Sequence, residues 1–232
     1  FASVAVDPIE KKPLRRWRPG TWILSLGGLH CNMLCPFCQN HAIAHPGRLP
    51  QDREISFGEL IAAAKRASLG AVAYTYNEPT LQAEYIFAAS PVLKGEGMAT
   101  VMVTNGMFSE SLCDEAIRRV VAMNVDVKTF DSTAYTRLGG SLDAVARNVE
   151  RLVAGGVHVE ITNLVVPGVS DSPDDFANLV GWAAGISPEL PLHISRYFPS
   201  FRFDEPPTDV SLIKKFHGIA QEKLKYVYTG NI

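Results

Sequence analysis

The sequence predicts an α/β protein whose parallel sheet is curved into a full or partial barrel. From about residue 21 onwards, short apolar runs alternate with longer amphipathic stretches. This alternation is typical of parallel strands joined by helices. Polar residues recur where at least four of the apolar runs end. The carboxyl ends of barrel strands converge on one mouth, whereas a doubly wound sheet gathers its site at one switch point. The spread of polar residues therefore favours the barrel.

The first strand is predicted at 21–26, where TWILSL precedes a pair of glycines. A helix should begin near Ser56, because Ser56 and Glu59 have the spacing of a capping box, and it should run to Gly70. The next strands are predicted at 71–76, 99–104, 124–128, 158–166 and 192–198. The helices between them start near 80, include DEAIRRVVA at 114–122, cover 141–154 and start near 174. A last helix carries VSLIKKFHGIAQEKL, and the closing KYVYTGN is a candidate seventh strand.

These elements predict one domain over 1–232, with 1–20 as an N-terminal extension and a loop at 46–50. A chain of 232 residues that is 47% hydrophobic is long enough to bury a sizeable core. Charged residues interrupt every apolar run, which argues against a transmembrane helix. The basic cluster in FASVAVDPIEKKPLRRW follows the apolar residues, which is the wrong order for a signal peptide. We therefore expect a cytoplasmic protein.

The charge balance excludes one class of partner. The chain has 22 basic and 24 acidic residues and a net charge of −2. A protein that binds nucleic acid generally shows a strong basic excess. We therefore expect no general nucleic-acid binding and no membrane partner. The basic run from Lys11 to Arg18 is expected to be a solvated face, with docking of a partner or anionic substrate as the alternative.

Three of the four cysteines lie within eight residues. Cys31, Cys35 and Cys38 share one segment, whereas Cys113 stands alone in a helical stretch. Thiols this close in a cytosolic protein suggest metal binding rather than disulfides. Three thiolates on one loop suit a [4Fe–4S] cluster in which one iron lacks a protein ligand. A small molecule can bind at such an open iron and receive an electron.

A zinc-binding loop is the alternative for this segment. Structural zinc usually takes four ligands from two separated pairs. His30 and His41 are candidate fourth ligands, but they lie beside the cysteines in the sequence. The cluster is therefore the favoured interpretation.

The segment GLHCNMLCPFCQNHAIA, with Phe37 before the last cysteine, resembles the radical S-adenosylmethionine (radical SAM) superfamily. The segments VDPIEKKPL, AYTYNEPT, NVDVK and HISRYFPSFRFDEPPT are similar to those of AmmeMemoRadiSam-system enzymes, which are relatives of pyruvate formate-lyase activating enzymes. The resemblance runs from Val6 to Asn231. It implies a partial (β/α)6 TIM-like barrel of the radical SAM type.

The resemblance also implies the cofactors. Cys31, Cys35 and Cys38 would ligate three irons of a [4Fe–4S] cluster, and S-adenosylmethionine would chelate the fourth. One-electron cleavage would then give methionine and a 5′-deoxyadenosyl radical. The residues assigned to cofactor binding by the resemblance are Phe37, Asn77, Glu78, Thr104, Asn105, Asp126, Lys128, Val165 and His193.

All of these positions except Phe37 have an expected role. Asn77 and Glu78 occupy the place of the superfamily's Gly-Gly-Glu motif, which binds the amino group of S-adenosylmethionine. Asp126 and Lys128 match contacts to its ribose and carboxylate, and Thr104 and Asn105 would line the ligand. The adenine end would be contacted by His193, Val165, Val166 and Pro167.

Some local alternatives stay open. Glu78 could only accept a helix-terminal amide, and Asp126 and Lys128 could only form an ion pair. Thr104-Asn105-Gly106 is also a common turn, and His193 could be a core hydrogen-bonding residue.

The family context implies partners as well: a reductant such as ferredoxin or flavodoxin, Memo-like and AMMECR-like proteins, and a substrate that the sequence does not identify. Two alternative functions remain, an activating enzyme for a glycyl radical enzyme and an iron–sulfur electron carrier. A carrier usually supplies four protein ligands to its cluster, whereas only three are evident here.

Overall fold

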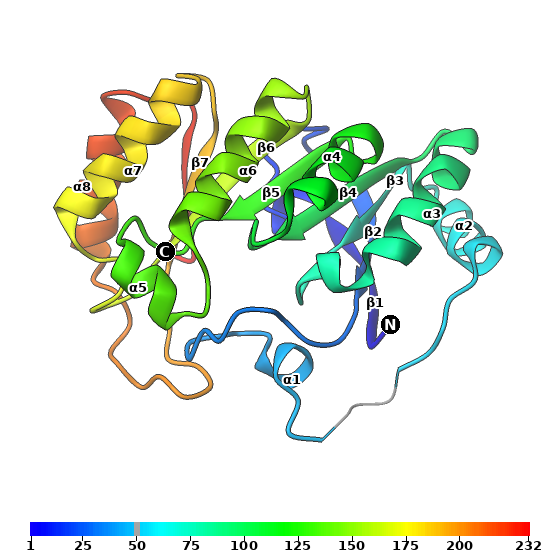
Figure 1. Cartoon of the computed structure of the whole chain (residues 1–232), viewed down its shortest axis with the longest axis horizontal. Coiled ribbons are helices and arrows are strands. Elements are labelled where there is room, and N and C mark those ends of the chain that lie inside the picture. The colour runs from blue at the N-terminus through cyan, green and yellow to red at the C-terminus, as the bar shows by residue number, and fades with distance from the viewer. Residues whose placement is uncertain (49–51) are drawn as a thin grey trace.

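The fold is a curved eight-stranded sheet with helices along its outer side, as the computed structural model of residues 1–48 and 52–232 shows (Figure 1). The strands are β1 (Ser3–Pro8), β2 (Trp22–Gly27), β3 (Ala71–Tyr74), β4 (Ala99–Thr104), β5 (Ala122–Asp126), β6 (His158–Val165), β7 (Leu192–Arg196) and β8 (Val227–Gly230). They lie side by side in sequence order, with β1 antiparallel to β2 and every later pair parallel. Because β1 and β8 are the two edges of this described sheet, the barrel is partial. The predicted α/β class and partial barrel are confirmed.

Helices cross from the carboxyl end of one strand to the start of the next. They are α1 (His41–Ala44), α2 (Phe57–Arg66), α3 (Ala83–Gly95), α4 (Glu110–Arg119), α5 (Ser132–Arg137), α6 (Leu142–Ala154), α7 (Pro173–Ile186) and α8 (Val210–Gln221), with short 3-10 helices η1 (Ile9–Lys11) and η2 (Pro79–Gln82). The capping box before α2 is confirmed: the Ser56 side chain accepts from Glu59 N, and the Glu59 carboxylate accepts from Ser56 N at 2.8 Å. Gly70 does not end this helix, since α2 stops at Arg66 and Ser68 takes the positive φ of 55°.

Two element boundaries differ from the sequence predictions. The helix expected to include 120–122 ends at Arg119, and Ala122 already begins β5. Val121 N donates to Thr100 O of the neighbouring strand, and this long-range bond favours extended backbone over the local helical pattern. Lys128 consequently lies beyond β5, which ends at Asp126. The expected loop at 46–50 is described only to residue 48, so its last two residues lie outside the described part.

The N-terminal extension contains a strand that the sequence analysis missed. β1 pairs along its full length with β2, from Ser3 opposite Gly27 to Pro8 opposite Trp22. Its alternation of Val4 and Val6 with Ala5 and Asp7 is the two-residue period of a strand. The six residues SVAVDP include a serine, an aspartate and a proline. They therefore lack the continuous apolar run that indicated most of the other strands.

The sheet has apolar residues on both faces because side chains alternate along each strand. The larger core lies between the sheet and the helices, and Leu24, Val72, Met102 and Met123 belong to it. A smaller core fills the interior near the start of the strands. It is formed by Ile9, Leu14, Ile23, Ala71, Ala73, Ala99, Val101 and Ala122, with Trp17 packed against it. The N-terminal segment therefore closes one end of the barrel and leaves the carboxyl ends of the strands for a site.

Glu160 of β6 fastens this N-terminal segment. Its buried carboxylate accepts from the backbone N–H of Arg15 at 3.0 Å and of Arg16 at 2.7 Å. His158 Nε2 and His193 Nε2 lie 3.0 and 2.7 Å from the same carboxylate. Burial alone would raise the pKa of Glu160, but these four hydrogen bonds outweigh it and lower the pKa from 4.5 to about 2.

We therefore expect Glu160 to make stability depend on pH. Because the pKa of Glu160 is lowered by folding, its ionised carboxylate stabilises the fold fully above pH 4.5. This contribution is lost as the pH falls from 4.5 towards 2. A shift of this size corresponds to about 3 kcal/mol at neutral pH. Glu160→Gln should lower the free energy of unfolding by about that amount at pH 7, and the difference from wild type should shrink below pH 4.5. Urea unfolding at a series of pH values measures it, with the exposed Glu222→Gln as control; a difference that did not change with pH would contradict the assignment.

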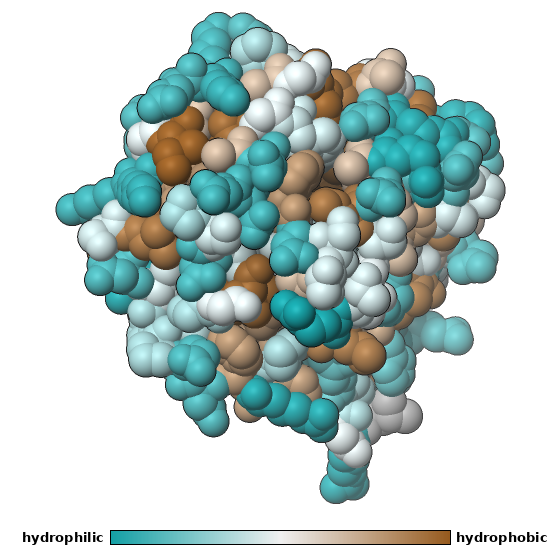
Figure 2. Space-filling view, turned by 60° about the vertical axis from the view of Figure 1, so that its left-hand side comes forward, coloured by the Kyte–Doolittle hydropathy of each residue, from teal (hydrophilic) through white to brown (hydrophobic). Residues whose placement is uncertain are grey.

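No helix in the described ranges is long and apolar enough to cross a bilayer. The side that carries α7 and α8 has apolar residues interspersed among hydrophilic ones (Figure 2).

Candidate functional site

The three neighbouring cysteines lie on the loop between β2 and α1, at the carboxyl end of the sheet. Three anchors hold this loop. Leu34 N donates to Leu138 O at 2.8 Å, Arg202 N donates to Pro36 O at 2.9 Å, and the Ser200 hydroxyl donates to Cys38 O at 3.2 Å. Two of the anchors come from the segment between β7 and α8, which therefore forms one wall of the site. The sequence did not predict these two contacts, because hydrogen bonds to backbone carbonyls leave no motif.

The side chains of the three cysteines differ in their burial. Cys35 is 8% exposed, and Cys31 and Cys38 are half-buried. Met33 N donates to Cys31 Sγ at 3.4 Å, and Asn105 Nδ2 donates to the same sulfur at 3.6 Å. Burial is the main effect on all three thiols and raises their pKa values, for Cys35 to about 11. Thiols of this kind become thiolates when a metal binds and withdraws their protons.

The arrangement argues against a single metal ion. Within residues 1–48 and 52–232, no group of three or more His, Cys, Asp and Glu side chains is placed to hold one ion. His41 Nδ1 lies 3.2 Å from Cys38 O and its ring stacks on Phe201, while His30 is exposed. Three thiols spaced around a loop, with N–H donors directed at sulfur, fit a [4Fe–4S] cluster with one open iron. Structural zinc usually takes four ligands, so the zinc alternative would need one more side chain beside the three thiols.

Asn77 ties the β3 end to the cysteine loop. Its Oδ1 accepts from Gly28 N at 2.9 Å, and its Nδ2 donates to Leu29 O and His30 O, both at 3.1 Å. These bonds hold the three residues that lead into Cys31. Tyr76, directly before Asn77, has a φ of 74°. Such a backbone conformation costs a non-glycine residue about 1–3 kcal/mol, so other contacts must maintain it.

Glu78 joins this loop to β4. Its Oε1 accepts from Thr104 Oγ1 at 2.8 Å, Thr80 Oγ1 at 2.7 Å and Thr80 N at 3.1 Å, and its Oε2 accepts from Asn105 N at 2.9 Å. Burial raises the pKa of Glu78, whereas these bonds oppose the rise. Because every partner donates, the ionised carboxylate is the form that the site satisfies. The bond from Thr80 N also makes Glu78 the N-cap of η2. Glu78 therefore accepts a helix-terminal amide, as one of the sequence alternatives proposed, in addition to its other bonds.

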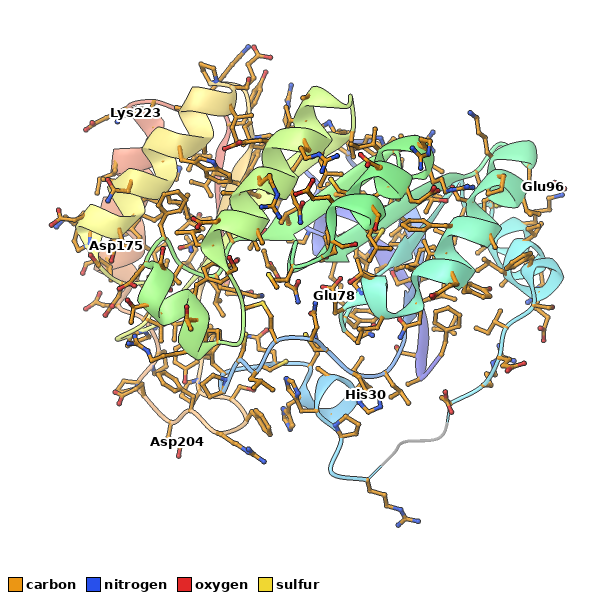
Figure 3. The ribbon with its side chains drawn as sticks, in the orientation of Figure 1. His30, Glu78, Glu96, Asp175, Asp204 and Lys223 are labelled. Atoms are coloured by element: carbon orange, nitrogen blue, oxygen red, sulfur yellow. The ribbon has the colours of Figure 1, made fainter. Side chains whose placement is uncertain are left out.

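Asn105 connects this carboxylate to the cysteines. Its backbone N–H reaches Glu78, and its Nδ2 donates to Asn32 Oδ1 at 2.7 Å as well as to Cys31 Sγ. Figure 3 shows Glu78 between the strand ends and the loop that carries His30. The predicted residues Asn77, Glu78, Thr104 and Asn105 thus meet at the cysteine loop.

Gly106 makes the turn after Asn105, with a φ of 74°. A Cβ at this position would lie 2.9 Å from Val125 Cγ1 and 3.1 Å from Val145 Cγ1. Gly106→Ala should therefore lower the free energy of unfolding by about 3 kcal/mol, from backbone strain and overpacking together. The matched control is Gly97→Ala, which has a φ of 73° and open space around its Cβ, and should cost about 1 kcal/mol. Equal losses in chemical denaturation would contradict the packing argument.

Asp126 and Lys128 form an ion pair beside the cysteines. Lys128 Nζ lies 2.7 Å from Asp126 Oδ2. Burial lowers the pKa of Lys128, but the charges of Asp126 and Cys35 outweigh this effect and raise it. Lys128 therefore keeps its positive charge next to the Cys35 sulfur. Both groups remain partly exposed, so a ligand can reach them.

His193, which was expected to contact the adenine end of the ligand, lies near the start of its strand and not at its carboxyl end. It is the second residue of β7, whose last residue is Arg196. Its ring stacks on Tyr228 with 5.1 Å between centroids and bonds to Glu160, not to the cysteine loop. The core hydrogen-bonding alternative describes this position.

Val165 and Phe37 are buried rather than open to a ligand. Val165 is 0% exposed in the core between sheet and helices, and Val166 is buried there too. The expected contact of Val165 and Val166 with adenine stays a prediction. Phe37 packs edge-to-face on Phe203 at 5.9 Å and supports the cysteine loop from below.

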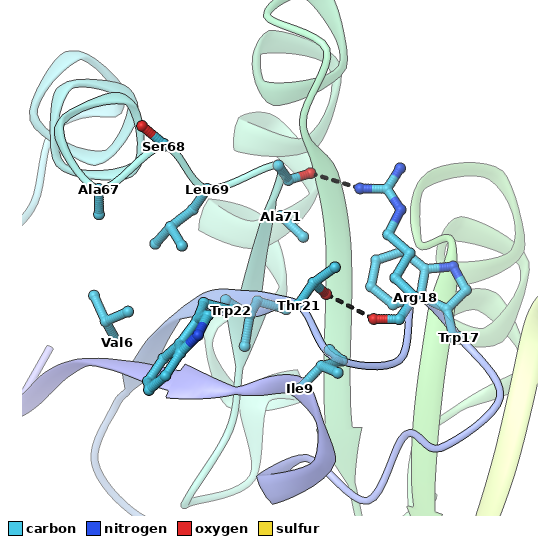
Figure 4. Close-up of a pocket in the computed structure, with 12 residues that line it drawn as sticks. Val6, Ile9, Trp17, Arg18, Thr21, Trp22, Ala67, Ser68, Leu69 and Ala71 are labelled. Carbon is cyan, nitrogen blue, oxygen red and sulfur yellow. Dashed lines mark hydrogen bonds between the residues drawn. The ribbon is translucent and has the colours of Figure 1, made fainter.

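A separate groove of about 530 Å³ lies where β2 and β3 begin, at the opposite end of the sheet (Figure 4). Val6, Trp22 and Leu69 line it, and Arg18 borders it by donating to Gly70 O at 3.0 Å. No residue of the cysteine loop contributes to this groove.

Comparison with known proteins supports the interpretation of the site. The Radical SAM superfamily profile matches residues 27–180. An uncharacterized protein of Methanocaldococcus jannaschii is 35% identical over 238 residues, which cover 99% of this chain and 70% of that protein.

Solved structures share the fold. A radical SAM methyltransferase from Sphaerobacter thermophilus superimposes with a TM-score of 0.67 at 18% identity, covering 92% of this chain and 67% of that one. SuiB of Streptococcus suis, bound to S-adenosylmethionine, superimposes with a TM-score of 0.68 at 17% sequence identity. The match covers 90% of this chain and 52% of SuiB. A domain of the pyruvate-formate lyase-activating enzyme from Bacteroides vulgatus superimposes with a TM-score of 0.59 at 16% sequence identity. The match covers 70% of this chain and 99% of that domain.

The superfamily profile spans more than half of the chain and includes the cysteine loop, Asn77, Glu78 and Asn105. Members of this superfamily are enzymes that use a [4Fe–4S] cluster with S-adenosylmethionine and need a reductant. This chain belongs to the radical SAM superfamily.

Proposed function

We propose that this protein cleaves S-adenosylmethionine reductively and uses the resulting 5′-deoxyadenosyl radical to abstract hydrogen from a substrate. The observation that carries the proposal is the set of three cysteine thiols on the loop between β2 and α1, within the residues that the radical SAM superfamily profile matches. Cys31, Cys35 and Cys38 would hold three irons, and the fourth would remain open to the amino and carboxylate groups of S-adenosylmethionine.

A cluster held by Cys31, Cys35 and Cys38 would supply the single electron that reductive cleavage of S-adenosylmethionine needs. The residues of the chain prepare this step. Lys128 places a positive charge beside Cys35, where it offsets thiolate charge and attracts a ligand carboxylate. Asp126 is an acceptor for ribose hydroxyls at the same strand end.

Asn77, Glu78 and Asn105 act on the loop more than on the ligand. The polar atoms of the Asn77 side chain are occupied by Gly28, Leu29 and His30. Those of Glu78 are occupied by Thr80, Thr104 and Asn105. In this proposal they fix the approach to Cys31, so that the cluster and its ligand meet in one geometry.

The AmmeMemoRadiSam type is the finer part of the proposal. It is supported by the segments AYTYNEPT and HISRYFPSFRFDEPPT, which lie on the β3 end and on the β7–α8 wall. Memo-like and AMMECR-like proteins are its proposed partners, and ferredoxin or flavodoxin its proposed reductant. In mixtures with candidate substrates, deuterium transferred into 5′-deoxyadenosine would identify the donor.

Anaerobic reconstitution tests the proposal. We expect about four irons and four sulfides per chain, binding of S-adenosylmethionine in calorimetry, and release of 5′-deoxyadenosine when dithionite is added. A loaded cluster that binds no S-adenosylmethionine would instead indicate the electron carrier. A glycyl radical signal after mixing with a partner enzyme would indicate the activating enzyme.

A further inference from the structure

Tyr76 has a constrained position beside the cysteine loop. It is the residue before Asn77, and its positive φ turns the chain from β3 towards that loop. Its ring lies against Gly27 of β2, where a Cβ would come within 3.0 Å of Tyr76 Cδ2. The absence of a side chain at Gly27 is therefore what admits the ring.

The Tyr76 hydroxyl reaches the N-terminal segment. It donates to Asp7 Oδ2 of β1. Lys12 Nζ lies 2.7 Å from the same oxygen and 4.2 Å from the centre of the Tyr76 ring. The Lys12 side chain is 1% exposed, although the sequence analysis expected it on a solvated face.

The three side chains affect one another's pKa values: burial lowers the pKa of Lys12, whereas its bond to Asp7 opposes the fall. Burial opposes ionisation of Asp7, but hydrogen bonds from Lys11, Lys12 and Tyr76 outweigh it and hold the pKa well below its usual range. Burial and Asp7 raise the pKa of Tyr76 to about 12. Tyr76 therefore keeps its proton and donates it to a carboxylate.

The free energy lost when two charges are desolvated often exceeds the attraction between them, so a buried ion pair often adds no net stability. Here the pair contacts the one side chain that precedes Asn77 and Glu78. Asn77 bonds to three successive residues before Cys31, and Glu78 bonds to the β4 end. A change in the backbone at Tyr76 would move both side chains together.

We propose that Asp7 and Lys12 are positioning residues that hold Tyr76, and through it Asn77 and Glu78, in the arrangement that binds S-adenosylmethionine. The inference rests on the proposed function and extends it to β1, which lies outside the 27–180 superfamily match. The N-terminal segment is then part of the cofactor site.

Tyr76→Phe in the reconstituted holoenzyme tests this inference, because it removes the hydroxyl and keeps the ring. We expect the Kd for S-adenosylmethionine in calorimetry to rise about tenfold, the loss of one hydrogen bond to a charged group. The change that S-adenosylmethionine causes in the EPR spectrum of the reduced cluster should require correspondingly more ligand. Iron content and the EPR spectrum without S-adenosylmethionine should match wild type.

Two further variants sharpen the test. Asp7→Asn keeps the size of the side chain and should weaken binding as Tyr76→Phe does. Lys11→Met is the matched control, because Lys11 bonds to the other Asp7 oxygen at 2.8 Å from a side chain that is 61% exposed. It should leave the Kd within about twofold of wild type.

The outcomes separate the two proposals. Wild type that binds S-adenosylmethionine together with an unchanged Kd in Tyr76→Phe would overturn this inference alone. A parallel loss of iron and affinity would overturn it too, since it would show a purely structural role. Wild type that loads its cluster but does not bind S-adenosylmethionine would overturn the proposed function, and the inference with it.

Discussion

Cys35→Ala is expected to abolish cleavage of S-adenosylmethionine. Cys35 is the most buried of the three thiols. Removing a neighbour of a metal ligand typically costs 10–100-fold, so removing a ligand itself should lower the rate by more than about 100-fold. Iron bound per chain and 5′-deoxyadenosine formed with dithionite are the two measurements.

Cys113→Ala provides the control for this variant. Cys113 is buried in α4 against Asn148 O, away from the cysteine loop. The Cys113→Ala variant should bind iron and cleave S-adenosylmethionine as wild type does, with only the small loss of stability that a shortened core side chain causes. A Cys35→Ala variant that still cleaved S-adenosylmethionine would remove the basis of the proposed function.

Glu78→Ala is expected to give the largest loss of stability. It leaves the donors of Thr80, Thr104 and Asn105 without their buried acceptor. Since each unsatisfied buried group costs about 1–3 kcal/mol, we expect the free energy of unfolding to fall by roughly 4 kcal/mol. Urea unfolding at pH 7 measures this loss, and iron retention should fall with it.

Glu78→Gln tests the charge state of the same residue. Its amide would have to face a donor, either the hydroxyl and N–H groups at Oε1 or Asn105 N at Oε2. We expect a loss of roughly half that of the alanine variant. Full stability in Glu78→Gln would show that an ionised carboxylate is unnecessary. Glu84→Ala, at an exposed position in the first turn of α3, should cost about 0.5 kcal/mol.

Local patterns predicted the parts of the fold and site that depend on neighbours in sequence. The spacing of Cys31, Cys35 and Cys38 indicated a cluster loop, and Ser56 with Glu59 indicated the start of α2. Polar residues after β3 and β4 indicated Glu78 and Asn105, which meet at that loop. These signals need no knowledge of distant partners.

The remaining features depend on long-range contacts. Lys12 is buried because Asp7 and Tyr76 surround it, and nothing adjacent to it in the sequence announces that pairing. His193 bonds to Glu160, which lies 33 residues away in the sequence, so no local pattern indicates this contact. Val165 packs in the core between sheet and helices, and the short run Leu164-Val165-Val166 does not show which of its side chains face the helices.

The anchors of the cysteine loop come from distant parts of the chain. Asn77 lies just beyond the end of β3, and Ser200 and the backbone of Arg202 lie between β7 and α8. The position of the three thiols therefore depends on contacts outside the cysteine segment. Substitutions in these two regions are expected to change the cysteine loop without altering any cysteine.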